Sequence, residues 1–533
     1  MTAGTVTPYR PGQQTGRDGF AQLLRAEWVK FRTVRGWVIG LVVAVLVMLG
    51  LGLFGAVGSN SSCQSTSGGP ARSGQGCSTA NPPVGPGGEA VSDSFYLVRQ
   101  PLAGNGSITV RVTSLTGLIP SRNGAGTGTQ PGLVPWAKAG IIIKASTQPG
   151  SAYAAMMVTA DHGVRMQDNF TGDTAGQPGT VTGSDPRWLR LTRSGDTITG
   201  YDSADALHWA QVGTVHLTGL PLTVQAGLFA ASPAYIAVTQ GLGGGENGII
   251  APSQDTAVFD HVSRSGTWPA GTWTGDYIGA DYGSGIGGYH QAGGRFTVTG
   301  SGDIAPVVPG QAGGEDLTVT TFLVGTFAGL IAVIVVAAMF ITVEYRRGLI
   351  RTTLIVSPRR GRVLAAKAIV IGSVAFVAGL VAAAAAVIFG TQLARGRVYV
   401  FPVSWLTELR IVVGTAALVA VAAVLALAVG TMLRRSAAAV TIVIVVIVLP
   451  YLLGVVSVLP ASAADWVLRI TPAAAFAVQQ AIPQYSQVTA LYSPGGSGGG
   501  YFPLAPWAGF AVLCGWAAIA VALALVLLRR RDV

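Results

Sequence analysis

The sequence predicts a polytopic α-helical membrane protein with six transmembrane helices and a large extracellular β-sandwich inserted between helices 1 and 2. Three observations predict this class. Half of the 533 residues are hydrophobic and 11% are charged, whereas about a quarter are charged in a typical soluble protein. Six uncharged windows are long enough to cross ~30 Å of hydrocarbon, namely 36–57, 317–343, 368–391, 411–433, 436–459 and 504–528. The stretch between the first two windows holds short β-type runs instead.

The net charge of +11 is unevenly distributed along the chain. Residues 1–35, 344–367, 434–435 and 529–533 together hold 18 basic and 4 acidic residues, whereas 58–316 hold 12 basic and 17 acidic residues. Basic residues beside membrane spans mark the cytoplasmic side. We therefore expect both termini to be cytoplasmic and residues 58–316 to be extracellular. Only four of the 34 basic residues are Lys, and with Ala/Gly/Val-rich spans this composition is typical of high-GC bacterial genomes, so a bacterial cytoplasmic membrane is expected. The basicity then reflects topology, and nucleic acid is not expected as a partner.

The N-terminal part divides into two segments. Residues 1–19 are rich in Pro, Gly and Gln and are expected to be disordered. Residues 20–57 are expected to form an interfacial helix followed by transmembrane helix 1. The interfacial helix is predicted because Phe20, Leu23, Leu24, Trp28 and Phe31 recur at helical spacing, while Arg25, Glu27, Lys30, Arg32 and Arg35 take the other positions. The alternative is that these residues are simply the basic flank of the first span.

The hydrophobic window 36–57 is longer than the ~7–15 residues of a signal-peptide core, so we expect an uncleaved span. A Ser/Gly/Pro-rich extracellular linker follows over 58–90. It contains Cys63 and Cys77, which are 14 positions apart and would form a disulfide in an oxidising compartment. Cys514 lies in the last span, where a small buried apolar residue is the expected role.

Residues 91–265 are predicted to form the sandwich, and 266–316 a Gly-rich extracellular segment. Short β-rich runs with turns between them indicate the sandwich; they cover 95–99, 107–115, 139–145, 153–159, 187–193, 197–201, 211–215, 222–230 and 257–262. Residues 264–312 either close the sandwich or form a loose stalk.

This half of the chain resembles the concanavalin/laminin-G-like sandwich domains of bacteria over 93–263. The likeness rests on the strings WAKAGI from Trp136, PRWLRL from Pro186, YDSAD from Tyr201 and AGL from Ala226, with Trp209 and Val258-Phe259-Asp260. Ala206 stands where the family has a turn glycine. Trp136, Trp188 and Trp209 are candidate contacts for an extracellular carbohydrate, and their other interpretation is sandwich core.

The remaining residues, 317–533, hold transmembrane helices 2–6 and a basic cytoplasmic loop over 344–367. Glu344–Ile355 contains no Pro and one Gly, so a helix can continue out of the bilayer, and Ser357-Pro358 then ends it. A new helix is expected near Val363. The loop is either a solvated topogenic connector or a docking surface for a soluble partner.

This loop resembles the segment after the second span of type-2 ABC-exporter permeases. The resemblance is carried by EYRRG from Glu344, RTTL from Arg351, SPRR from Ser357 and Lys367, and the string LLRAEWVKFRTVR from Leu23 resembles the N-terminus of the same family. It implies contact with a separate ABC ATPase subunit and a homodimer or paired permease. The implied coupling residues are Glu344, Arg346, Arg347, Gly348, Leu349, Arg351, Leu354, Pro358, Arg359, Arg360 and Lys367.

Motifs for catalysis are absent from the sequence. No Lys follows a Gly, so there is no phosphate-binding loop, and H-E-x-x-H, G-x-S-x-G and C-x-x-C do not occur. We expect no enzyme activity, no cofactor and no metal, with ATP hydrolysis in the separate subunit. No ionisable residue lies mid-span, which favours an apolar or amphipathic cargo over a small ion. The alternative function is a non-transporting membrane anchor for a sugar-binding or adhesive sandwich.

Overall fold

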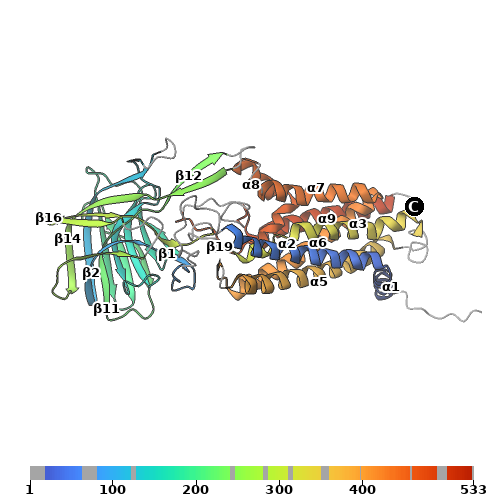
Figure 1. Cartoon of the computed structure of the whole chain (residues 1–533), viewed down its shortest axis with the longest axis horizontal. Coiled ribbons are helices and arrows are strands. Elements are labelled where there is room, and N and C mark those ends of the chain that lie inside the picture. The colour runs from blue at the N-terminus through green and yellow to red at the C-terminus, as the bar shows by residue number, and fades with distance from the viewer. Residues whose placement is uncertain are drawn as a thin grey trace, which may run out of the picture.

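The structure is a computed structural model that describes residues 19–62, 81–121, 128–240, 246–279, 286–309, 316–349, 359–395, 398–455, 459–488 and 501–530. A β region occupies one end of an elongated molecule and a helical bundle occupies the other (Figure 1). The chain enters the bundle with its first helices, crosses to the β region, and returns to the bundle for the rest of its length.

The bundle is built from α1 (Phe20–Thr33), α2 (Arg35–Ser62), η1 (Val319–Leu323), α3 (Thr326–Arg346), α5 (Arg360–Ala394), α6 (Trp405–Leu433), α7 (Ser436–Val455), α8 (Ala461–Ile470), η2 (Pro472–Gln479) and α9 (Pro506–Arg530). Within the described residues, six helices are long and apolar enough to cross a membrane: α2, α3, α5, α6, α7 and α9. They coincide with the six uncharged windows, so the prediction of six such helices is confirmed.

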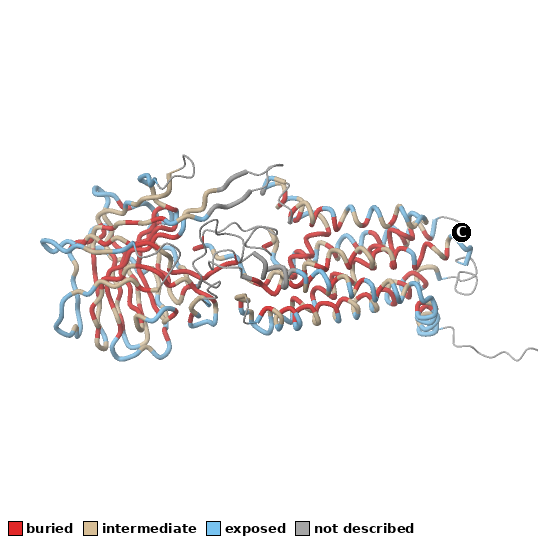
Figure 2. The backbone as a smooth tube through the Cα atoms, in the orientation of Figure 1, coloured by how far each residue is buried: buried red, intermediate tan, exposed pale blue. Residues whose placement is uncertain are grey.

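The centre of the bundle is apolar and tightly packed. The middle of α6 is buried on most sides (Figure 2), as expected for a helix that is hydrophobic all round. Small residues allow the helices to approach closely: a Cβ added at Gly329 would lie 2.3 Å from Cγ of Met48 on α2. The short 3₁₀ helix η2 is buried among the longer helices, and its last residue, Gln479, donates to Thr326 and Thr415 at 3.2 Å each. These contacts join α3 and α6.

The β region begins with β1 (Val91–Asp93), β2 (Phe95–Pro120), β3 (Thr129–Pro131), β4 (Lys138–Lys144), β5 (Tyr153–Thr159), β6 (Val164–Asp168), β7 (Gly172–Ala175), β8 (Arg187–Ser194), β9 (Thr197–Ser203) and β10 (Ala210–His216). It continues with β11 (Thr223–Ala231), β12 (Tyr235–Gln240), β13 (Glu246–Ala251), β14 (Gln254–Thr267), β15 (Thr274–Ile278), β16 (Gly288–Ala292), β17 (Arg295–Gly300) and β18 (Ile304–Pro306). Fourteen of the described strands form one hydrogen-bonded sheet, and its main path runs β10-β9-β8-β2-β11-β4-β5-β6-β7.

Strand β2 joins the two layers of the sandwich. Its first part pairs with β11 and β15, and its later part pairs with β8 and β14. Side chains from both parts meet in one core: Leu102 and Ile108 belong to the same buried cluster as Ile141 and Leu189. The prediction of two separate strands at 95–99 and 107–115 is therefore wrong. The chain passes through Gly104 without a turn because partner strands hydrogen-bond to it on both sides of that glycine.

The segment 264–312 contributes strands to this sheet and is not a loose stalk. Strand β15 pairs with the start of β2, and β17 pairs with β14 and β16. The aromatic side chains of Trp273 and Phe296 contact each other edge to face, with ring centroids 5.4 Å apart. Inward-facing Phe296 and Val298 then join the core between the layers.

Two helix ends differ from expectation. The helix predicted to run from Glu344 to Ile355 stops at Arg346, because Gly348 takes a left-handed conformation with φ of +68°. A glycine in this conformation is a common helix terminator since it has no Cβ. Helix α5 begins at Arg360, earlier than the predicted start near Val363, and therefore includes part of the basic loop.

Candidate functional site

Three elements meet at the end of the bundle far from the β region: α1, the end of α3 and the start of α5 (Figure 1). Aromatic side chains hold α1 in place there. Phe31 is 3% exposed, and its ring centroid lies 5.9 Å from that of Phe340 on α3. Trp37, at the start of α2, packs edge to face on the same Phe340 ring at 5.0 Å. Helix α1 is thus a packed part of the bundle.

Four charged side chains, Glu27, Lys30, Glu344 and Lys367, form an ion-pair cluster next to the Phe340 ring. Lys367 Nζ lies 2.6 Å from Glu27 Oε2 and 2.7 Å from Glu344 Oε1. Lys30 Nζ lies 2.8 Å from Glu27 Oε1 and 3.3 Å from Glu344 Oε1. Glu27 and Lys30 belong to α1, Glu344 to α3 and Lys367 to α5. Each acid therefore contacts both lysines, and the cluster joins all three elements.

The cluster is buried on one side and reaches water on the other. The side chains of Glu27 and Lys367 are fully buried, that of Glu344 is 7% exposed and that of Lys30 is 39% exposed. Lys367 Nζ also lies 4.7 Å from the ring centroid of Phe340, within the range of a cation–π contact. Burial alone would lower the pKa of Lys30, but the hydrogen bond and charge of Glu27, reinforced by Glu344, hold that pKa above its ordinary value.

Two acids and two lysines balance in formal charge. The free energy lost by desolvating a buried ion pair can equal the free energy gained from the attraction between its charges, so such a cluster is weak evidence for stability. Loss of one partner, by contrast, leaves an uncompensated buried charge. The cluster therefore favours one specific docking of α1 against α3 and α5 over any other arrangement.

The described coupling residues lie around this cluster. Arg346, Arg347 and Arg359 are exposed, Leu349 is 48% exposed, and Arg360 Nη1 donates to the carbonyl of Leu528 on α9 at 2.5 Å. The structure thus brings Glu344 and Lys367, near the two ends of the loop, into direct contact. Arg351, Leu354 and Pro358 lie outside the described residues.

Sequence reasoning did not find the roles of Glu27 and Lys30. Both were assigned to the polar face of an interfacial helix, yet Glu27 points into the bundle and is completely buried. One signal was available: Glu27 is the only acidic residue in the segment from Phe20 to Arg35, which holds four basic ones. An isolated acid in a basic segment suggests a specific partner, but the sequence does not reveal which cation that is.

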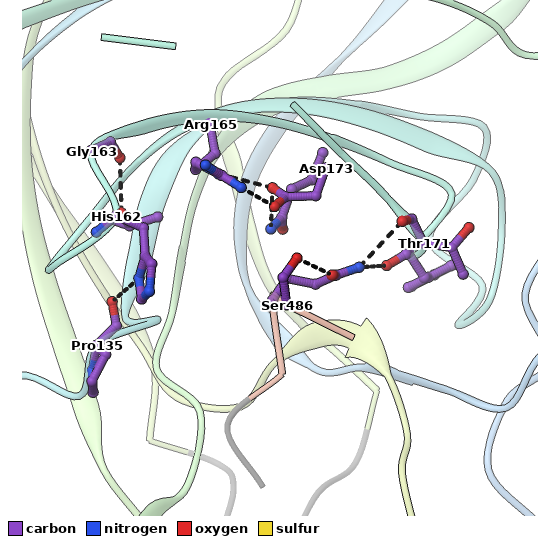
Figure 3. A network of polar contacts seen from close by, with 11 residues as sticks. Pro135, His162, Gly163, Arg165, Thr171, Asp173 and Ser486 are labelled. Atoms are coloured by element: carbon purple, nitrogen blue, oxygen red, sulfur yellow. Dashed lines mark hydrogen bonds and ion pairs between the residues drawn. The ribbon is translucent and has the colours of Figure 1, made fainter. Parts of the chain in front are cut away.

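A second junction connects the bundle to the β region. Gln487, in the segment between η2 and α9, donates from Nε2 to the carbonyls of Phe170 and Thr171 at 3.0 and 3.3 Å. Figure 3 shows Ser486 beside Thr171 at this contact. Val488 packs with Ala305 and Val308 nearby.

Two further contacts strengthen the same junction. The short strands β19 (Asp316–Leu317) and β20 (Tyr399–Val400) pair in parallel. Phe401, just after β20, packs against Ala90 and Val307 from the β region. Three separate chain segments therefore fix the β region on the bundle, and Gln487 is the polar residue among them that the sequence analysis missed.

The three tryptophans proposed for sugar contact lie in different environments. Trp136 is 4% exposed and its ring stacks on His162 with centroids 3.8 Å apart. Trp188 and Trp209 are half-buried, and the Arg190 guanidinium lies 3.8 Å from the Trp209 ring centroid. His162 Nδ1 donates to the Pro135 carbonyl oxygen at 3.2 Å, as Figure 3 shows.

No cluster of three or more His, Cys, Asp or Glu side chains suited to a metal occurs among the described residues. Arg165 and Asp173, also in Figure 3, form an ion pair between neighbouring strands β6 and β7. Cys63 and Cys77 lie outside the described residues, so their pairing stays a prediction.

Comparison with known families gives one extensive match. A family model described as ABC-2 family transporter protein matches residues 23–533. No curated protein matches the chain.

Solved structures give partial likenesses only. They include a functionally unknown protein from Saccharomyces cerevisiae, with 17% identity over 32% of this chain and 74% of that chain at a TM-score of 0.20. A GH43 protein from Bacillus licheniformis has 16% identity over 24% of each chain at a TM-score of 0.17. Scytalido-glutamic peptidase has 7% identity over 40% of this chain and 100% of that chain at a TM-score of 0.23. At these TM-scores the likenesses carry no argument about function.

Proposed function

Because the chain belongs to the ABC-2 family of transporter proteins, we propose that it is the membrane permease subunit of an ABC exporter that works with a separate ATPase. The observation that carries the proposal is the ion-pair cluster of Glu27, Lys30, Glu344 and Lys367 within this family framework. It connects α1 and the two ends of the basic loop 344–367, which is where a soluble subunit would act on the bundle.

The proposed orientation places this end of the bundle in the cytoplasm. The basic residues at the ends of α1, α3 and α9 support it, since Lys and Arg are enriched on the cytoplasmic side of membrane spans. Both termini are then cytoplasmic, and residues 58–316 are extracellular at a bacterial cytoplasmic membrane. The ATPase reaches the loop from inside the cell, and the β region lies outside.

Movement of the loop would be passed on through α1, α3 and α5 together. An ATPase that pushes on exposed Leu349 or Arg347 displaces the end of α3. Because Glu344 contacts Lys367 at 2.7 Å, that displacement is shared with α5, and because Lys367 contacts Glu27 it is shared with α1. Two such bundles, as a homodimer or a paired permease, would then rearrange around the substrate.

The polar content of the spanning helices supports an apolar or amphipathic substrate. The hydroxyls of Thr342, Thr415 and Thr431 are buried, and each donates to the carbonyl four residues earlier in its own helix, at 2.7–2.8 Å. Hydroxyls satisfied in this way offer few free partners to a hydrated ion. Transport of a small ion normally requires ionisable or polar groups within the membrane.

The alternative function is a non-transporting anchor that displays a sugar-binding or adhesive sandwich. Sugar recognition usually employs an exposed aromatic face. His162 covers one face of Trp136, and Arg190 lies over Trp209. These contacts favour the structural role for both rings, and a single span would suffice for display. The exporter proposal therefore takes precedence.

Co-purification tests the proposal. The full chain is co-expressed with a candidate ATPase subunit, and Leu349→Asp and Leu354→Asp are compared with a variant in which Arg346, Arg347, Arg359 and Arg360 are replaced by Gln. Buried apolar residues carry most of the energy of a protein interface, so each Asp variant should lose at least about tenfold in ATPase recovery at matched membrane levels.

A topogenic connector would give the opposite ranking. In that case the Arg replacements disturb insertion while both Asp variants recover the ATPase normally, and the coupling assignment is wrong. A second measurement tests whether ATP hydrolysis belongs to the separate subunit. The purified chain alone should hydrolyse no ATP, and sustained hydrolysis by a preparation free of contaminants would contradict the proposal.

A further inference from the structure

A groove opens on the outside of the bundle between α2 and α3. It encloses about 670 Å³, and its walls are mainly apolar, with Trp37, Gly40 and Val43 on one side and Ala332 and Val336 on the other. From Ala332 to Arg347, just after the end of α3, it extends over fifteen residue steps, roughly 22 Å at 1.5 Å per step. These dimensions suit one extended acyl chain.

The groove exists because α2 and α3 diverge toward the ion-pair cluster. At their far ends the helices touch, since a Cβ added at Gly325 would lie 2.3 Å from the Met48 carbonyl oxygen. At Gly40 an added Cβ would still lie 2.6 Å from Val336 Cγ2. At Gly36, one turn nearer the cluster, an added Cβ would meet nothing within 4 Å. The space is therefore wedge-shaped and widest at Gly36.

The wide end of the groove is cationic. Lys30 and Arg347 both line it, and Arg347 is exposed. Glu344 also lines it, but Lys367 at 2.7 Å and Lys30 at 3.3 Å neutralise its carboxylate. With the four-residue cluster balanced, Arg347 leaves a net positive charge at the mouth. A phosphate bound there would be held by charge-assisted hydrogen bonds.

The outer surface beside the groove is apolar. On α2, Ile39 is 59% exposed and Leu46 is 61% exposed. Such side chains face acyl chains when the helix spans a bilayer. A lipid can thus enter the groove sideways with its headgroup at the level of Arg347.

We propose that the groove between α2 and α3 binds an anionic phospholipid of the surrounding membrane, with its phosphate at Arg347 and Lys30 and one acyl chain between Trp37 and Ala332. Basic pockets between membrane helices are suited to such headgroups. The bound lipid would contact Lys30 and Glu344, which belong to the ion-pair cluster that positions α1. Binding of the lipid would therefore affect how firmly α1 packs against α3.

Native mass spectrometry of the delipidated full chain in detergent tests this, with phosphatidylglycerol and phosphatidylcholine as probes. The intact chain should bind one phosphatidylglycerol at least about tenfold more tightly than phosphatidylcholine. Gly36→Leu places a side chain in the open end of the groove and should abolish that binding. Gly50→Leu is the matched control, because Gly50 lies on the same helix, away from the groove, and an added Cβ there also meets nothing within 4 Å.

The headgroup contact is tested separately with Arg347→Gln, which should remove the preference for phosphatidylglycerol and leave phosphatidylcholine binding unchanged. Equal binding of both lipids by the intact chain would overturn the proposal, as would equal effects of Gly36→Leu and Gly50→Leu. A change of oligomeric state confined to Gly36→Leu would also overturn it and assign the groove to a second copy. None of these readouts depends on an ATPase, so they are independent of the proposed transport function.

Discussion

Lys367 Nζ and Glu27 Oε2 lie 2.6 Å apart, both completely buried, although 340 positions separate them in the chain. Their contact joins α1 to the start of α5. Glu344, at the end of α3, closes the arrangement from the other side. The loop 344–367 is thus bounded by residues that touch each other and α1.

Replacing Lys367 with Met should destabilise the bundle. The change leaves Lys30 as the remaining cation in contact with Glu27 and Glu344 among the described residues, and breaking a buried pair in this way costs about 3–5 kcal/mol. Thermal unfolding of the purified chain in detergent measures the loss. In the double variant Lys367→Met/Glu344→Gln the cluster is again neutral, so most of the stability should return. If the double variant is as unstable as the sum of the two single variants, the pairs do not act together.

Replacing Gln487 with Glu should loosen the junction between the β region and the bundle. A carboxylate of the same shape cannot donate to the carbonyls of Phe170 and Thr171, and repels them instead. Removing donors from buried carbonyls costs about 1–3 kcal/mol. Hydrogen exchange of peptides that cover β6 and β7 in the full chain should accelerate. Ser486→Ala removes only the 3.4 Å hydrogen bond from Ser486 Oγ to Gln487 Oε1 and keeps both donors of Gln487, so it should have little effect. Unchanged exchange in Gln487→Glu would contradict a role for this residue in docking.

The parts of the fold that depend on local composition were predictable. A window of twenty uncharged residues has one stable form in a bilayer, so α2, α3, α5, α6, α7 and α9 could be placed from hydropathy alone. Strands such as β5 and β8 were also found, because short runs separated by turn residues indicate strands.

Features that depend on partners far along the chain were not predictable. The continuous strand β2 crosses Gly104 only because β11 and β14 hydrogen-bond on either side of it. The burial of Glu27 depends on Lys367, 340 positions later. Helical periodicity alone assigned Glu27 to the polar face, since a charged residue is rarely fully buried unless it is paired.

The β region should be less stable at neutral than at acid pH because of Asp255. Its side chain is completely buried on β14, and this burial raises the pKa of its carboxyl well above the ordinary 3.8. At pH values between 3.8 and the raised pKa, Asp255 is protonated in the folded state and ionised in the unfolded state. Stability is therefore fully present below pH 3.8 and is lost as pH rises through the folded pKa.

Asp255→Asn should abolish this dependence. The amide is uncharged at every pH and has nearly the shape of a protonated carboxyl. Compared with the unmodified chain at the same pH, the variant should slow hydrogen exchange in β14 and β17 at pH 7 and have little effect near pH 4. A variant that destabilises the strands at pH 7 would mean that the Asp255 side chain is charged when folded.

Orientation gives the last prediction. Cys63 and Cys77 both fall in the predicted extracellular linker, and an oxidising exterior would join them because only 14 positions separate them. A disulfide that closes a loop of this length restricts the unfolded chain and contributes about 3 kcal/mol. Reduction should therefore shift the electrophoretic mobility of the intact chain, and Cys63→Ser should show no such shift. In the same variant the freed Cys77 should react with a membrane-impermeant maleimide added to whole cells, whereas a cysteine introduced at Arg359 should react only after lysis. Labelling of Cys77 only after lysis would reverse the orientation and place the ion-pair cluster of Glu27 and Lys367 outside the cell, where no ATPase could reach it.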